Sequence, residues 1–181
     1  MSTKRWWEYC LLPTIAALTV VVDQVTKKQV MAHLQPNESW APLPLLKTWF
    51  SITHVNNTGA AFGLFPDYGN VFMLIAVIVV VAIAVYYWHM PAGQKLVKLS
   101  LGLQLGGAVG NLLDRLQYGH VVDFIDFKIW PVFNLADSSI VLGVLLLAYA
   151  LLREPREDNP AAGQDEGQAF NRQRTGINSP E

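Results

Sequence analysis

Long apolar stretches alternate with polar segments along this chain. Four of the apolar stretches approach the roughly 20 residues that a membrane-spanning helix requires. They cover about residues 9–30, 68–88, 97–118 and 132–152. The second carries no charged side chain, and the third is rich in glycine, which suits close helix packing in lipid. The pattern therefore predicts an all-α membrane protein with four transmembrane helices.

Two segments fall outside this pattern. Residues 34–67 contain prolines, aromatics and short alternating runs, and they are too long for a turn and too apolar for a disordered linker. They predict a small β-rich cradle on the membrane surface, with a strand near residues 49–55. Residues 154–181 combine Pro, Gly and mixed charge, which predicts a disordered polar tail. We therefore expect a single membrane domain over residues 1–153.

The composition supports a membrane protein and argues against several other classes. Hydrophobic residues make up 52% of the chain and charged residues 15%, against roughly 25% charged residues in ordinary soluble domains. The net charge of −1 leaves no basic surplus of the kind that nucleic acid binding requires, so no nucleic acid partner is expected. One cysteine and no HExxH motif give neither a disulfide framework nor the pattern of a zinc protease. No metal or other cofactor is expected.

The orientation of the spans follows from the distribution of Lys and Arg. The bias is small and favours both termini in the cytoplasm, which places the cradle on the extracytoplasmic side. A secretory signal peptide is the alternative for the first apolar stretch, because Lys4 and Arg5 precede it. That stretch has no convincing small-residue cleavage site before Asp23, and the later stretches require a membrane in any case.

Acidic residues converge on one side of the membrane in this arrangement. Asp23 and Asp114 lie near the C-terminal ends of the first and third spans, and Asp137 lies near the start of the fourth. Asp123 and Asp126 lie in the short connection between the third and fourth spans. Because successive spans run in opposite directions, all of these acids approach the same membrane interface. Ionisable groups at such a depth are costly and are functional-site hypotheses by default.

Structural roles are the alternatives for some of these acids. Asp23 could pair with Lys27 at i+4, and Asp114 and Arg115 could form a buried or interfacial structural pair with other residues. Asp137 is harder to explain in this way, because it lies within an apolar run where a purely structural carboxylate would need compensation.

A pair of carboxylates can supply both the base and the acid that hydrolysis of a peptide bond needs. Two carboxylates held together in a partly dry site share one proton near neutral pH. The ionised one takes a proton from water as the water attacks a carbonyl, and the protonated one hydrogen-bonds the oxygen that gains negative charge. Peptide cleavage then needs no metal, serine or cysteine. Asp126 is better explained as a solvated loop acid or a partner of Lys128.

Five sequence blocks occur in the order seen in the lipoprotein signal peptidases. They are residues 23–27 (DQVTK), 57–62 (NTGAAF), 106–115 (GGAVGNLLDR), 121–124 (VVDF) and 133–137 (FNLAD). The chain resembles this family, also called signal peptidase II, over roughly residues 15–145. Any single block is a weak signal, but all five at these spacings make chance agreement improbable.

The resemblance implies a four-helix bacterial membrane aspartyl endopeptidase. Members of this family remove the signal peptide from diacylglyceryl-modified prolipoproteins, cutting just before the lipidated cysteine. By motif, the implied catalytic dyad is Asp123 and Asp137, and Asp126 matches no catalytic position. The family's other functional polar positions fall on Asp23, Asn57, Asn111, Asp114, Arg115 and Asn134.

The resemblance also implies a location and partners. The implied location is the bacterial plasma (inner) membrane, with the active site near the extracytoplasmic face. The family's β-rich cradle and short surface helix between the first two spans agree with the interpretation of residues 34–67. The expected partners are the diacylglyceryl prolipoprotein substrate and membrane lipid, and we expect a monomer. Asn57 and Arg115 are expected to contact the substrate or a lipid headgroup.

The spacing of the amides suggests how the acids are oriented. Asn111 and Asp114 are three residues apart, as are Asn134 and Asp137, so each pair shares one helical face. Two Asn–Asp pairs are therefore expected to face each other, with the amides orienting the carboxylates through hydrogen bonds.

Two alternatives come from other functional classes. The first is a small proton or ion transporter that uses the intramembrane Asp residues as a relay. Transporter sites usually lie near the midplane between internal repeats, whereas the acids here crowd one edge and no repeat is visible. The second is a membrane scaffold without catalysis, which would not need carboxylates that face each other.

Overall fold

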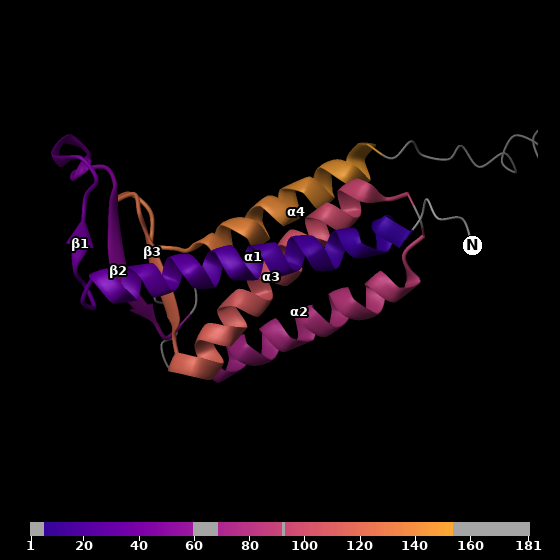
Figure 1. The fold of residues 1–181 in the computed structure, drawn as a ribbon, viewed down its shortest axis with the longest axis horizontal. Coiled ribbons are helices and arrows are strands. Elements are labelled where there is room, and N and C mark those ends of the chain that lie inside the picture. The colour runs from indigo at the N-terminus through magenta and orange to yellow at the C-terminus, as the bar shows by residue number, and fades with distance from the viewer. Residues whose placement is uncertain (1–5, 60–68, 92, 154–181) are drawn as a thin grey trace, which may run out of the picture. The chain divides into compact units, whose positions relative to one another are not determined.

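The chain folds around four long helices (Figure 1). The computed structural model describes residues 6–59, 69–91 and 93–153. Its helices are α1 (Trp6–His33), α2 (Gly69–His89), α3 (Lys95–Tyr118) and α4 (Leu135–Arg153). All four are long and apolar enough to cross a membrane. The protein is thus a multi-pass membrane protein, and the predicted fold class is confirmed.

The chain divides into two compact units, residues 1–151 and residues 152–181. The fold described below belongs to the first unit. The predicted polar tail, residues 154–181, lies outside the described residues, and so does the part of the predicted cradle after residue 59. The proposed domain limit at residue 153 stays a prediction.

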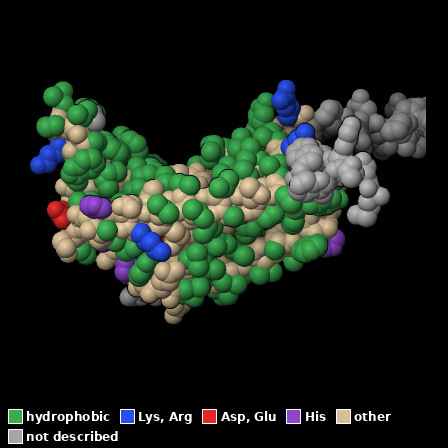
Figure 2. All heavy atoms as spheres, viewed as in Figure 1, with side chains coloured by type: hydrophobic (Ala, Val, Ile, Leu, Met, Phe, Trp, Pro, Cys, Tyr) green, Lys and Arg blue, Asp and Glu red, His purple; other side chains and the backbone are tan. Residues whose placement is uncertain are grey.

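The helices expose apolar side chains where a water-soluble protein would carry polar ones (Figure 2). Examples on three helices are Leu18, Ile78 and Leu142, which are 57%, 57% and 50% exposed. Only 6% of the most apolar window of α2 is buried. Exposed apolar surface on this scale suits contact with hydrocarbon.

Glycines on α3 let α1 and α4 approach it closely. A Cβ atom at Gly106 would lie 2.5 Å from Cβ of Thr19 on α1. A Cβ atom at Gly107 would lie 2.4 Å from the carbonyl oxygen of Ala136 on α4. No larger residue fits at either contact, which agrees with the small-residue packing typical of membrane helices. α3 also packs against α2, so it lies among the other three helices.

A three-stranded antiparallel sheet lies at one end of the helices (Figure 1). Its strands are β1 (Ser39–Trp40), β2 (Ser51–Asn57) and β3 (Val121–Asp126), in the order β1-β2-β3. A short 3-10 helix, Pro44–Leu46, lies between β1 and β2. The strands β1 and β2 confirm the β-rich element expected between the first two helices.

The strand β3 corrects the expectation for the connection between the third and fourth helices. We expected a short connection there, with Asp126 as a solvated loop acid. In the structure the connection forms a strand, and residues 121–124 are all buried. Gly119 ends α3 in a left-handed conformation with φ of 78°, which is the usual role of glycine at a helix C-terminus. The chain then returns along β2, with Val55 opposite Asp123.

The start of α4 also differs from the expected residue 132. The N–H of Phe133 donates a hydrogen bond to the carbonyl oxygen of Ile125 in β3 at 3.1 Å, and the N–H of Ile125 donates to the carbonyl oxygen of Phe133 at 2.7 Å. The helix can therefore begin only after Asn134. Because α1 and α3 end, and α4 begins, next to the sheet (Figure 1), this end of the fold collects the predicted site residues.

Candidate active site

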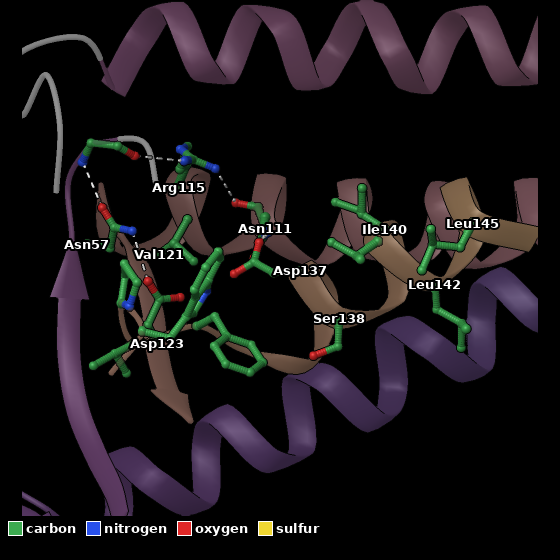
Figure 3. A pocket seen from close by; sticks show the side chains of 16 residues that line it. Asn57, Asn111, Arg115, Val121, Asp123, Asp137, Ser138, Ile140, Leu142 and Leu145 are labelled. Carbon is green, nitrogen blue, oxygen red and sulfur yellow. Dashed lines mark hydrogen bonds between the residues drawn. The ribbon is translucent and has the colours of Figure 1, made fainter. Parts of the chain in front are cut away.

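A cavity of about 730 Å³ lies where the sheet meets the helices (Figure 3). Its described polar lining residues are Asn57, Asn111, Arg115, Asp123, Asp137 and Ser138. Its apolar lining includes Trp130, Phe133, Ile140, Leu142 and Leu145. The cavity thus brings together both acids of the predicted dyad and three of the predicted supporting residues.

Asp123 is held in this cavity by two amide groups. It is carried on β3 and is 2% exposed. Its Oδ2 accepts a hydrogen bond from Nδ2 of Asn57 at 2.8 Å, and its Oδ1 accepts one from Nδ2 of Asn134 at 2.7 Å. The pKa of Asp123 is raised to about 7, first by burial and second by the charge of Asp137. The hydrogen bonds from Asn57 and Asn134 oppose this rise. Asp123 can therefore gain or lose a proton near neutral pH.

Asp137 is fixed by the N-terminus of its own helix. Asn134 is the N-cap of α4, since its Oδ1 accepts a hydrogen bond from the N–H of Asp137 at 2.9 Å. The N–H of Asn134 donates in return to Oδ2 of Asp137 at 3.3 Å, which completes a capping box. The other carboxylate oxygen, Oδ1, accepts a hydrogen bond from Nδ2 of Asn111 at 2.7 Å.

The amides therefore bind carboxylates, but in an arrangement that the spacing did not reveal. Asn111 of α3 donates a hydrogen bond to Asp137 of α4, and Asn134 donates one to Asp123 of β3. Nδ2 of Asn134 also donates to Oδ1 of Asn111 at 3.1 Å, which links the two halves. Asn134 precedes α4 as its cap and does not lie on a helical face, and Asp114 turns to other partners.

Those partners include a buried lysine that was not among the predicted site residues. Nζ of Lys27 lies 2.8 Å from Oδ2 of Asp23 and 2.8 Å from Oδ2 of Asp114. It also donates to Oδ1 of Asn111 at 3.0 Å. Lys27 is 1% exposed and both acids are 0% exposed. Because an ammonium group only donates, it orients the Asn111 amide with Nδ2 toward Asp137.

The sequence held one signal for Lys27, its i+4 spacing from Asp23. The structural alternative for Asp23, a pair with Lys27, is present in the structure. The structural alternative for Asp114, a buried pair with another residue, is present as well, and the partner is Lys27.

Asp23 and Asp114 also hold the two elements that carry the cavity acids. The N–H of Ala136, the residue before one cavity acid, donates to Oδ1 of Asp23 at 3.0 Å. The N–H of Val122, the residue before the other, donates to Oδ2 of Asp114 at 3.1 Å. Neither Asp23 nor Asp114 is among the described residues that line the cavity. They therefore hold the backbone next to each cavity acid without lining the cavity themselves.

Arg115 places a positive charge at the cavity. Its Nη2 donates to the carbonyl oxygen of Gly59 at 3.3 Å, and its Nη1 donates to that of Asn111 at 3.5 Å. These contacts link α3 to the chain just after β2 (Figure 3). Asn57, at the end of β2, accepts a hydrogen bond from the N–H of Gly59 at 3.0 Å, so its amide is held as well.

Asp126 is bound to partners of its own. Its Oδ2 accepts hydrogen bonds from Oγ1 of Thr53 at 2.8 Å and from Nζ of Lys128 at 2.5 Å. Burial alone would raise the pKa of Asp126, but the hydrogen bonds from Lys128 and Thr53 outweigh it and lower the pKa. The partner role with Lys128 is confirmed, although Asp126 is buried and not solvated.

Solved structures show which class of protein has this fold. A bacterial membrane enzyme determined by the in meso method superposes with a TM-score of 0.73 and 32% sequence identity, covering 82% of this chain and 91% of that chain. Another bacterial membrane enzyme gives a TM-score of 0.70 at 33% identity, with coverages of 79% and 93%. The fold is therefore that of a class of bacterial membrane enzymes.

Sequence comparison identifies the family. A family profile for signal peptidase (SPase) II matches residues 15–153. The lipoprotein signal peptidase of Moorella thermoacetica is 48% identical over 138 residues, which cover 76% of this chain and 90% of the relative. That of Halothermothrix orenii is 43% identical over 142 residues, with coverages of 78% and 95%. The chain belongs to the signal peptidase II family and is a protease, which confirms the resemblance and argues against the transporter alternative.

The contacts of Lys27 predict that it is essential for stability. Replacement of Lys27 by Met leaves two buried carboxylates without their cation, which costs about 3–5 kcal/mol. Lys128→Met is the matched control, because its pair with Asp126 is partly exposed at the lysine and should cost about 1 kcal/mol or less. Thermal unfolding in detergent compares the two variants. Equal losses of stability would contradict the role given to Lys27.

Proposed function

We propose that this protein removes the signal peptide from diacylglyceryl-modified bacterial prolipoproteins, cutting just before the lipidated cysteine, by an aspartic-type mechanism. The observation that carries this proposal is the pair of acids in the cavity. Each accepts hydrogen bonds from amide groups, and within the part of the chain that the structure describes neither forms a salt bridge. The named relatives, which are lipoprotein signal peptidases, support the substrate. No metal or cofactor takes part in the proposed reaction.

The proposed reaction begins with one proton shared by Asp123 and Asp137. The pKa of Asp123 near 7 suits it to hold that proton at neutral pH. Asp137 then takes a proton from a water molecule whose oxygen attacks the scissile carbonyl carbon. Asp123 donates its proton toward the carbonyl oxygen as that oxygen becomes negative. When the tetrahedral intermediate collapses, the C–N bond breaks and the proton on Asp137 goes to the departing amine of the cysteine. One hydroxyl group of the intermediate returns its proton to Asp123, which restores the starting state of the acid pair.

The cavity walls suit a substrate that is partly in lipid. Ile140, Leu142 and Leu145 of α4 give the cavity an apolar wall along a membrane-spanning helix. An apolar signal segment or acyl chain can lie there while its polar end reaches the acids. Arg115 offers a cation to a carbonyl or headgroup oxygen at the same end.

The proposed setting is the bacterial inner membrane. Both termini are cytoplasmic in this proposal, and the cavity opens near the extracytoplasmic face, where a translocated prolipoprotein presents its cleavage site. The small bias of Lys and Arg supports this orientation. We propose a monomer, because the described chain supplies both acids and their amide partners.

The acid pair predicts the effect of isosteric substitutions. Asp123→Asn and Asp137→Asn keep the side-chain shape but cannot transfer the proton, so each should lower cleavage by roughly 10²–10⁴-fold or more. Mass spectrometry of products from a diacylglyceryl-modified prolipoprotein and the detergent-purified protein measures this. Asp126→Asn is the control and should keep activity.

An unlipidated form of the same prolipoprotein should remain uncut in this assay. An inactive Asp126→Asn enzyme with an active Asp137→Asn enzyme would overturn the assignment of the acids. Failure of the folded wild-type protein to cut the lipidated substrate would overturn the proposed function itself.

The Asn57–Asp123 hydrogen bond predicts a shift in pH dependence. This bond favours the ionised carboxylate and lowers the pKa of Asp123. Asn57→Leu should therefore raise that pKa, and the alkaline limb of the kcat/KM profile should move to higher pH. Asn56→Leu is the control, because Asn57 rather than Asn56 bonds to Asp123. If the alkaline limb of the Asn57→Leu profile stays in place or moves to lower pH, deprotonation of Asp123 does not cause the loss of activity at high pH.

A further inference from the structure

A second cavity also borders Asp123. Its volume is about 410 Å³, which lies within the range of ligand pockets, roughly 300–1,000 Å³. Its described lining residues are Val55, Asn56, Asn57, Thr58, Asp123, Pro131 and Val132. The 730 Å³ cavity shares Asn57, Asp123, Pro131 and Val132 with it. If the scissile bond of a substrate lies at Asp123, the segment before the bond can enter one cavity and the segment after it can enter the other.

The lining of the second cavity follows the backbone of a strand. Side chains along a strand point alternately to opposite faces, so a cavity over one face would be lined by every second residue. Here the consecutive residues 55–58 all contribute, and so does Asp123 of the neighbouring strand β3. The cavity therefore follows the main chain at the end of β2 and also reaches β3. β1 pairs with β2 only at Ile52 and Thr53. Within the described residues, β2 therefore has no strand partner beyond His54 on the edge that faces away from β3.

We propose that this second cavity binds the polypeptide segment that follows the cleaved bond, extended along the end of β2 and the residue that follows it, residues 55–58. The proposal rests on the proposed function and assigns the substrate's mature side to a site. The apolar wall of the 730 Å³ cavity, formed by α4, suits the signal peptide. The segment on the other side of the bond then enters the cavity that shares Asp123 with it.

The dimensions and chemistry of the strand edge fit a short extended peptide. Four extended residues, the last three of β2 and Thr58, cover on the order of 10 Å at about 3.3 Å per residue, so roughly three or four substrate residues can lie beside them. Strand addition of this kind gains affinity from main-chain hydrogen bonds and leaves side chains largely free. The site should therefore recognise an extended backbone and tolerate varied side chains.

Two substrates with the same signal peptide and lipidated cysteine test this site. The short substrate ends at an amidated lipidated cysteine, and the long substrate continues for about five residues. For the wild-type protein, the long substrate should have a KM about tenfold lower than the short one. Asn56→Trp fills the cavity without touching the proposed catalytic pair, so it should raise KM for the long substrate about tenfold and leave the short substrate unchanged. Thr58→Trp provides a second variant, and Gln117→Trp, at an exposed position on α3, is the control.

Each outcome decides between the alternatives. A wild-type KM that is equal for both substrates would overturn the second site while leaving the proposed function intact. Equal increases in KM for both substrates in the Asn56→Trp and Thr58→Trp variants would also overturn it, because the mature segment would then play no part in the effect. A wild-type protein that cuts neither substrate would instead count against the proposed function.

Discussion

The ammonium group of Lys27 lies between two carboxylates and an amide, out of contact with water, and the rest of the site depends on it. Removal of charges from water is costly unless they are paired and hydrogen-bonded. The two carboxylates are also bound by backbone N–H groups of α4 and β3. One buried cluster therefore joins α1 to α3 and fixes the two elements that carry the proposed catalytic acids. Substitution of the lysine would disturb all four elements together.

The acids of the buried cluster and the proposed catalytic acids have different partners. Asp23 and Asp114 share a cation, so their charge is compensated within the protein. Asp123 and Asp137 instead receive hydrogen bonds from neutral amides, which orient the carboxylates without cancelling their charge. Burial and the neighbouring carboxylate can then raise the pKa of Asp123 to about 7. This difference in partners supports the two roles proposed for these four acids.

Much of this arrangement could be predicted from the sequence. The lengths of the apolar stretches gave four helices, and their alternating directions placed the acids at one end. The strand β3 could not be predicted, because its buried residues show no alternation and its partner β2 lies far away in the sequence. The Asn111–Asp137 and Asn134–Asp123 pairs depend on that strand and on the cap of α4, so spacing within single helices could not reveal them. Lys27 was visible only as an i+4 partner of Asp23.

The central claim is that the acid pair activates water directly, and a single turnover in H₂¹⁸O tests it. Excess wild-type enzyme would cut a diacylglyceryl-modified prolipoprotein once, and mass spectrometry would measure both products. Direct attack by water predicts that ¹⁸O enters the new C-terminal carboxyl group of the signal peptide and that the lipidated cysteine becomes the N-terminal residue of the other product. A released signal peptide that carries only ¹⁶O would contradict the account, because an aspartate oxygen would then have been transferred through a covalent intermediate.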